Sequence, residues 1–116
     1  MTDSPMSAST VLDPLALSRA ISESYHNRSL GQVNDHEIRM SVMTQQFQWH
    51  HHPNSDETFF CVDGELVVEF ADGQVIVRPG QFVTVPAGTV HRTRPLGARS
   101  ANLTIERVST QTCFDE

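Results

Sequence analysis

The sequence predicts an all-β protein, a sandwich or small barrel with one short helix before it, and three observations support this. With 116 residues the chain is long enough for one hydrophobic core and too short for two. From residue 32 onward apolar and polar residues alternate, which is the period of a half-buried strand. Turn signals such as Asp63-Gly64, Asp72-Gly73 and Pro86-Ala87-Gly88 recur about every eight to twelve residues.

The N-terminal part divides into two segments. Residues 1–12 are rich in Ser, Thr, Asp and Pro, and we expect them to be disordered. Asp13-Pro14 then predicts a helix start, with a carboxylate N-cap and proline at the first helical position. We therefore expect a short N-terminal helix and linker over residues 13–31. The apolar stripe at helical spacing consists of Leu17, Ala20, Ile21, Ser24 and Tyr25.

The barrel is expected over residues 32–108, followed by a C-terminal tail over residues 109–116. About eight short strands fit the alternation and the turns. We read Asp63-Gly64 as a tight two-residue hairpin turn that fixes the register of its two strands. The predicted strands include residues 38–43, 58–62, 65–70, 74–78, 81–85, 91–94 and 101–108.

Composition and charge exclude several classes of partner. The net charge is −6, and the eight basic residues are all arginine. Because no basic stripe alternates with aromatic residues, neither a nucleic acid nor an anionic membrane is expected as a partner. The start of the chain resembles no signal peptide, so we expect a cytoplasmic protein. Two cysteines make no disulfide framework, and Cys61 and Cys113 are expected to be free thiols.

The strongest chemical signal is a histidine triplet followed by a carboxylate and, much later in the chain, by another histidine. His50 and His52 are separated by one residue, so on a strand both side chains point to the same face. Glu57 follows after a turn, and His91 lies 34 residues beyond it. Three imidazoles and one carboxylate are ligands that a borderline divalent metal prefers. His51 faces away on such a strand and is expected at the surface or an interface.

Two motifs resemble those of the cupin superfamily. The spacing His50-x-His52-x4-Glu57-x6-Gly64 looks like the first cupin motif, and Gly80-x5-Pro86-x-Gly88-x2-His91 looks like the second. The resemblance implies a small single-domain cupin, folded as a jelly-roll (double-stranded β-helix) barrel. It also implies that His50, His52, Glu57 and His91 bind one divalent metal ion inside the barrel, with Fe, Mn, Ni and Zn all open.

One position departs from the family pattern. Where the second motif usually continues with Asn, four residues after the histidine, this chain has Pro95. The family asparagine is not a metal ligand, so the change concerns the local turn rather than the metal.

Strand alternation also predicts which side chains surround the metal. Gln46 and Gln48 should share the inner face with His50, where they either orient a substrate or complete a polar network. Phe59 and Cys61 should face inward with Glu57, as an apolar wall and a small buried hydrophobic side chain. Together with Thr93, two residues after His91, these are the candidate substrate-binding residues. Among the arginines, Arg39 is the candidate for the barrel mouth.

The predicted function remains a choice between two classes. The favoured one, implied by the resemblance to cupins, is a small-molecule metalloenzyme, of dioxygenase type first and isomerase or lyase type second, in which the metal with water or O2 would carry the chemistry. The alternative is a non-catalytic cupin that binds a metal or small ligand. Phe47, Trp49, Phe60 and Val62 are expected on the outer face, which needs cover, so a homodimer is also predicted.

Overall fold

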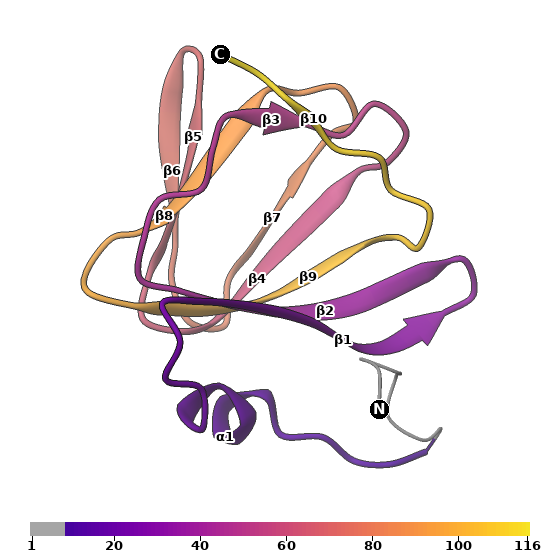
Figure 1. Ribbon diagram of the computed structural model, residues 1–116, viewed down its shortest axis with the longest axis vertical. Coiled ribbons are helices and arrows are strands. Elements are labelled where there is room, and N and C mark those ends of the chain that lie inside the picture. Colours follow the sequence, from indigo (N-terminus) through magenta and orange to yellow (C-terminus); the bar gives the residue numbers. More distant parts are fainter. Residues whose placement is uncertain (1–8) are drawn as a thin grey trace.

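The computed structural model describes residues 9–116, so most of the segment expected to be disordered, residues 1–12, lies outside the described residues. Two five-stranded antiparallel sheets form the jelly roll (Figure 1). The first sheet has the order β1-β2-β9-β4-β7 and the second the order β10-β3-β8-β5-β6. The strands are β1 (Tyr25–Val33), β2 (His36–Met43), β3 (His50–His51), β4 (Glu57–Asp63), β5 (Leu66–Phe70), β6 (Gly73–Val77), β7 (Phe82–Val85), β8 (His91–Pro95), β9 (Ser100–Arg107) and β10 (Cys113–Phe114).

The helix begins where the sequence indicated and ends earlier. Helix α1 spans Pro14–Arg19, and the Asp13 side chain accepts a hydrogen bond from the Ala16 backbone N–H at 3.1 Å. The prediction that residues 25–31 belong to the helix and linker was wrong, because Tyr25–Val33 pairs with β2 as a strand. The barrel therefore starts at Tyr25 rather than at residue 32. Within residues 9–116, no helix is long and apolar enough to cross a membrane.

Hydrophobic side chains pack in two places. The inner cluster fills the space between the sheets, with Phe59 and Cys61 from the first sheet packing against Leu66 and Val68 from the second. The outer cluster lies on the opposite face of the first sheet, where Met40 and Val42 pack beneath the helix. Buried apolar area stabilises a fold by roughly 25 cal/mol per Å², so both clusters contribute. The helix thus covers only the outer face and leaves the barrel interior open to the site. The outer cluster is contacted by Leu17 of the helix and by Leu12 and Ile21 on either side of it.

The Asp63-Gly64 turn connects the two sheets rather than forming a hairpin. β4 pairs with β7 and β9, whereas β5 pairs with β6 and β8, so the strands on either side of the turn are not hydrogen-bonded neighbours. The expectation that this turn sets the register between its two strands was therefore wrong. Gly64 has φ +71°, and a Cβ placed there would lie 2.2 Å from the Arg99 carbonyl oxygen. Glycine is needed because another backbone passes this close.

The segment expected to be a tail is part of the second sheet. Cys113 and Phe114 form β10, which pairs antiparallel with His51 and His50 of β3. Figure 1 shows this last segment running beside β3, at the edge of the barrel. The end of the described chain therefore lies against the strand that carries the first histidine of the triplet.

Candidate metal centre

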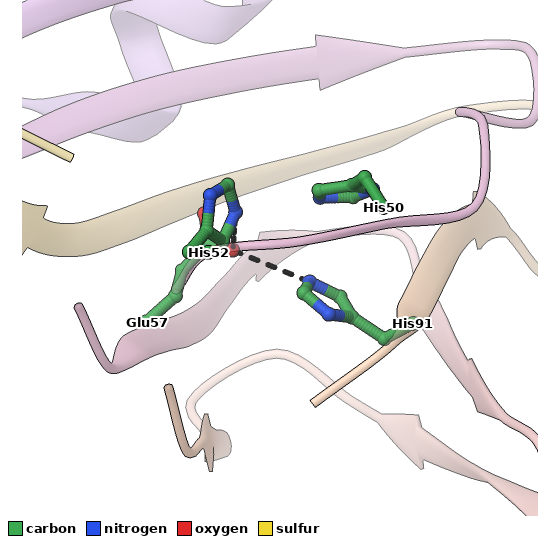
Figure 2. A group of neighbouring side chains, drawn as sticks. All are labelled: His50, His52, Glu57 and His91. Atoms are coloured by element: carbon green, nitrogen blue, oxygen red, sulfur yellow. Dashed lines mark hydrogen bonds and ion pairs between the residues drawn. The ribbon is translucent and has the colours of Figure 1, made fainter. Parts of the chain in front are cut away.

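The fold brings the four predicted ligands together inside the barrel. His50 lies on β3, His52 just after it, Glu57 at the start of β4 and His91 at the start of β8. All four side chains are buried, and one ligand atom from each lies within 4.8 Å of the others. Figure 2 shows them turned toward a common centre. His51 does not join them, because its Nδ1 pairs with a carboxylate oxygen of Asp115 at 2.8 Å.

Each of the three rings is oriented by a hydrogen bond to a backbone carbonyl. In every case Nδ1 is the atom that bonds, which places the proton there and directs Nε2 to the centre. Such bonds to the second ring nitrogen are typical of histidines that ligate metals. The pairs are His50 with the Gln48 oxygen (2.7 Å), His52 with the Gln111 oxygen (3.0 Å) and His91 with the Thr89 oxygen (2.8 Å).

The donor set fits a divalent ion. Nε2 of His91 is buried and forms no hydrogen bond, although Oε1 of Glu57 lies 3.4 Å away. A buried nitrogen without a partner is costly unless something else satisfies it. The four ligand atoms already lie within 4.8 Å of one another, so all four could bind one ion. These residues could therefore hold a metal ion without rebuilding the barrel.

In the metal-free protein the ionisable groups of this centre shift one another's pKa. Burial raises the pKa of the Glu57 carboxyl, but the adjacent rings of His52 and His91 outweigh burial and lower the pKa to about 2. Burial lowers the pKa of His52, but Glu57, with Oε1 3.1 Å from Nε2, outweighs burial and raises that pKa. Burial lowers the pKa of His50, and the neighbouring imidazoles act in the same direction. In the metal-free centre Glu57 is thus ionised, and its charge makes His52 hold a proton more tightly than an ordinary histidine does.

Metal affinity is expected to fall as the pH drops, because an ion must displace the proton from His52. Since the pKa of His52 is raised, this competition begins above the ordinary histidine value of about 6.5. Below that pKa, one competing proton weakens binding about tenfold per pH unit. Competition with a chelator between about pH 8 and pH 6 measures this slope. An affinity that stays flat across this range would argue against imidazole ligation.

The turn between His52 and Glu57 is fixed by three consecutive polar side chains. Asn54 binds the segment after β9, donating to the Ser109 oxygen at 2.9 Å. Ser55 accepts from the backbone N–H of Arg107 at 3.0 Å, at the end of β9. Asp56 accepts from the backbone N–H of Ala87 at 2.8 Å, in the turn before β8. Each side chain therefore holds a different segment against the turn, which keeps the two ligands in place.

A cavity of about 310 Å³ opens beside the centre. Phe59 and Thr93 line it, as the sequence predicted, and both are buried. Cys61, also a candidate for substrate binding, does not line the cavity. It lies in the inner cluster as a small buried hydrophobic side chain. The pocket wall also includes Tyr25, Arg39, Phe47 and Glu106.

The two glutamines lie elsewhere. Gln46 and Gln48 are exposed, and they line a hollow on the outside of the barrel with Trp49 and Arg92. The prediction that they face inward was wrong because residues 46–49 form no strand, so the alternation counted back from His50 does not apply. Phe47, which was expected outside, instead lines the cavity and contacts the His50 ring edge-on at 5.0 Å between ring centroids.

Sequence reasoning missed Glu106, a second carboxylate in the cavity. It lies on β9 directly opposite Glu37 of β2. Burial raises the pKa of Glu106 to about 7, and the charge of Glu57 acts in the same direction. The signal was present in the alternation of β9, because Asn102, Thr104 and Glu106 share one face and the first two are buried. Arg39 reaches the same cavity, as predicted, and is held by Asn27 and Glu37.

A double-stranded β-helix with three histidines and one glutamate at its centre is the arrangement found in cupins, and the comparisons agree. The chain matches the family model for the cupin domain over residues 36–105. It therefore belongs to the cupin-domain family. It is 39% identical over 103 residues to the Bacillus subtilis protein YdbB, described only as uncharacterized, covering 88% of this chain and 90% of YdbB.

Two further kinds of similarity are more limited. Quercetin 2,3-dioxygenase of Bacillus subtilis is 46% identical over 46 residues, which is 39% of this chain and 13% of that enzyme. A cupin-2 domain protein from Shewanella frigidimarina has a TM-score of 0.77 at 22% identity, covering 84% of this chain and 94% of its own. A double-stranded β-helix protein from Klebsiella pneumoniae has a TM-score of 0.78 at 15% identity, covering 94% and 93%. At these identities the two structures show the fold alone.

Proposed function

We propose that this chain is a metal-dependent cupin enzyme that oxidises a small polar molecule with O2. The observation that carries the proposal is the convergence of His50, His52, Glu57 and His91 on one buried point beside a cavity. The local similarity to quercetin 2,3-dioxygenase favours dioxygenase chemistry over other cupin reactions. A single divalent ion, Fe, Mn, Ni or Zn, would be held by these four side chains, and when bound it would supply Lewis acidity or, as iron, redox chemistry toward O2.

The side chains around the centre suit a substrate that is partly apolar and partly polar. Phe47 and Phe59 form an apolar wall that excludes water from the centre. Arg39 offers a guanidinium that Asn27 and Glu37 hold in place through Nε and Nη1. Its planar group can orient an anionic or carbonyl oxygen of the substrate. The Thr93 hydroxyl lies on the same wall and can add a hydrogen bond.

The proposal is tested by elemental analysis of untagged protein purified without added metal, next to the Glu57→Ala variant. Bound iron, together with oxygen consumption on a panel of small phenols and carboxylic acids, supports the proposal if the variant loses both. Bound zinc, nickel or manganese without oxygen consumption would favour a Lewis-acid isomerase or lyase. Bound metal without turnover of any compound would favour the non-catalytic binding protein.

Two expectations from the sequence, a cytoplasmic location and a homodimer, stay predictions. The outer face of the first sheet offers apolar surface beyond the helix, including Phe82, which is 68% exposed, and Ile105, which is 37% exposed. Part of the surface expected to need a partner is already covered, since Val62 packs into the outer cluster beneath the helix.

A further inference from the structure

Residues 109–116, the C-terminal strap, form one wall of the cavity. Thr110, Thr112 and Phe114 all line it, so alternate side chains of an extended segment point inward. The strap crosses beside β3 at the edge of the barrel (Figure 1). Phe114 also approaches the rings of Phe47 and His50, with centroids 6.0 Å and 6.3 Å away. A ligand that reaches the centre therefore meets the strap.

The strap is attached mainly to the segment that carries the first two ligands. Its strand, β10, pairs with β3 through two residue pairs. The Asp115 backbone N–H donates to the Trp49 oxygen at 2.8 Å, and the Asp115 carboxylate pairs with His51. It contributes no residue to either hydrophobic cluster. Segments held by few buried apolar contacts open at low free-energy cost, so the strap is a wall of the cavity that can be displaced without unfolding either hydrophobic cluster.

Asn54 holds the strap at its other end with both atoms of its side-chain amide. Nδ2 donates to the Ser109 oxygen at 2.9 Å, and Oδ1 accepts from the Gln111 backbone N–H at 2.8 Å. These two bonds fix the peptide on both sides of residue 110. They also present the Gln111 carbonyl to Nδ1 of His52 at 3.0 Å. Asn54 thus orients a metal ligand through the strap, without touching the ligand ring.

His52 differs from the other two histidines in this respect. The carbonyls that orient His50 and His91 lie two residues earlier in the chain, on the same local segment. The carbonyl that orients His52 lies 59 residues away, on the strap, where the Thr112 hydroxyl is also 3.2 Å from Nδ1. If the strap moves, His52 alone loses the bond that selects its tautomer and ring orientation.

We propose that Asn54 is a positioning residue for the metal centre, and that the strap couples opening of the cavity to metal retention. With the strap closed, His52 is oriented for ligation and the cavity is walled on this side. With the strap displaced, the cavity opens and the His52 ring is free to turn, so the ion is held by fewer oriented ligands. The metal part of this inference rests on the proposed function.

The test compares metal release from the whole chain and from Asn54→Ala. Each protein is loaded with Co2+, a chelator is added, and the loss of the cobalt absorption is followed. Because loss of an outer hydrogen-bond partner costs about 10- to 100-fold in metal affinity, release from Asn54→Ala should be faster by about that factor. Asn54→Asp keeps the acceptor for the Gln111 N–H but loses the donor to Ser109. Its release rate should therefore lie between the rates of the unmodified chain and of Asn54→Ala.

Two controls separate the strap from general loosening of the turn. Gln111→Ala removes an exposed side chain but keeps the carbonyl that holds His52, so release should be unchanged. Asp56→Ala breaks a different anchor of the same turn, the bond to Ala87, but leaves both bonds to the strap, so it should speed Co2+ release less than Asn54→Ala does. Faster release from Asp56→Ala than from Asn54→Ala would overturn the role of the strap. If Asn54→Ala does not fold, Gln111→Pro removes the same N–H and takes its place.

A metal-free readout keeps the inference distinct from the proposed function. In the NMR spectrum of the metal-free chain, the Nδ1 proton of His52 should exchange slowly with water because the Gln111 carbonyl holds it. Asn54→Ala should make that proton exchange fast while leaving the protons of His50 and His91 unchanged. If the His52 Nδ1 proton exchanges as slowly in Asn54→Ala as in the parent chain, the strap inference is wrong even if the chain binds metal. If the exchange of this proton changes but the chain binds no metal, the proposed function and the metal part of this inference fail, while the orientation of His52 by Asn54 through the strap stands.

Discussion

Glu57→Ala and His91→Ala are each expected to lose bound metal, whereas His51→Ala should still load to the level of the parent chain. Glu57 supplies the only carboxylate in the ligand cluster of the described chain, and His91 supplies a buried Nε2 that no protein atom satisfies. Removing a ligand should cost more than the 10- to 100-fold that follows from loss of an outer partner. His51 lies outside the cluster and pairs with Asp115.

The measurement is metal content after dialysis against a weak chelator, with circular dichroism to confirm that each variant is folded. Loss of metal in His51→Ala would mean that His51 faces the centre in place of His50 and His52, so that the ligand strand is shifted by one residue. Because successive side chains on a strand point to opposite faces, no smaller error could bring His51 inward.

Gly64→Ala is expected to destabilise the fold by about 3 kcal/mol or more, the second large effect. A residue with a side chain pays roughly 1–2 kcal/mol for the left-handed backbone region, and a clash that shifts packed backbone adds about 1–3 kcal/mol. Both costs apply here, since φ is +71° and the new Cβ would lie 2.2 Å from the Arg99 carbonyl oxygen. That oxygen belongs to backbone, so it cannot turn aside as a flexible side chain would.

Gly80→Ala is the matched control for this substitution. Gly80 also has a positive φ, +83°, but an added Cβ would meet no atom within 4 Å. Gly80→Ala should therefore lower the free energy of unfolding only by the backbone cost, roughly 1–2 kcal/mol. Urea unfolding of the three metal-free chains measures the difference. If Gly64→Ala and Gly80→Ala lose equal free energy of unfolding, the close approach of Arg99 to Gly64 does not add to the cost of the substitution.

The sequence could predict the ligands because their spacing follows the alternation of side chains along a strand, which is a local property of the chain. His50 and His52 share a face through strand alternation, and Glu57 returns after a turn of four residues. The same rule correctly placed Phe59 and Thr93 on the cavity wall. It failed for Gln46, because the chain between β2 and β3 is irregular and alternation does not extend through it.

Other features were not predictable because they depend on contacts between distant segments. β10 is two residues long and has no periodicity of its own, and its pairing with β3 became visible only in the fold. The apolar stripe at helical spacing reached as far as Tyr25, yet Tyr25–Val33 pairs along β2 as a strand. Tertiary pairing overrides a weak local preference in such cases. The alternation of β9 placed Glu106 on one face with Thr104, but only the fold showed that this face lines the cavity.

The ligands come from both sheets, and this gives a bound ion a mechanical role. Glu57 belongs to the first sheet, while His50 and His91 belong to the second. Only a single residue pair, His50 with His91, joins β3 to β8. An ion that binds the folded chain and not the unfolded chain would link the two sheets. It would raise the free energy of unfolding by about 2.7 kcal/mol when its free concentration is 100 times the Kd. The folded fraction of this protein would then rise and fall with the supply of its metal.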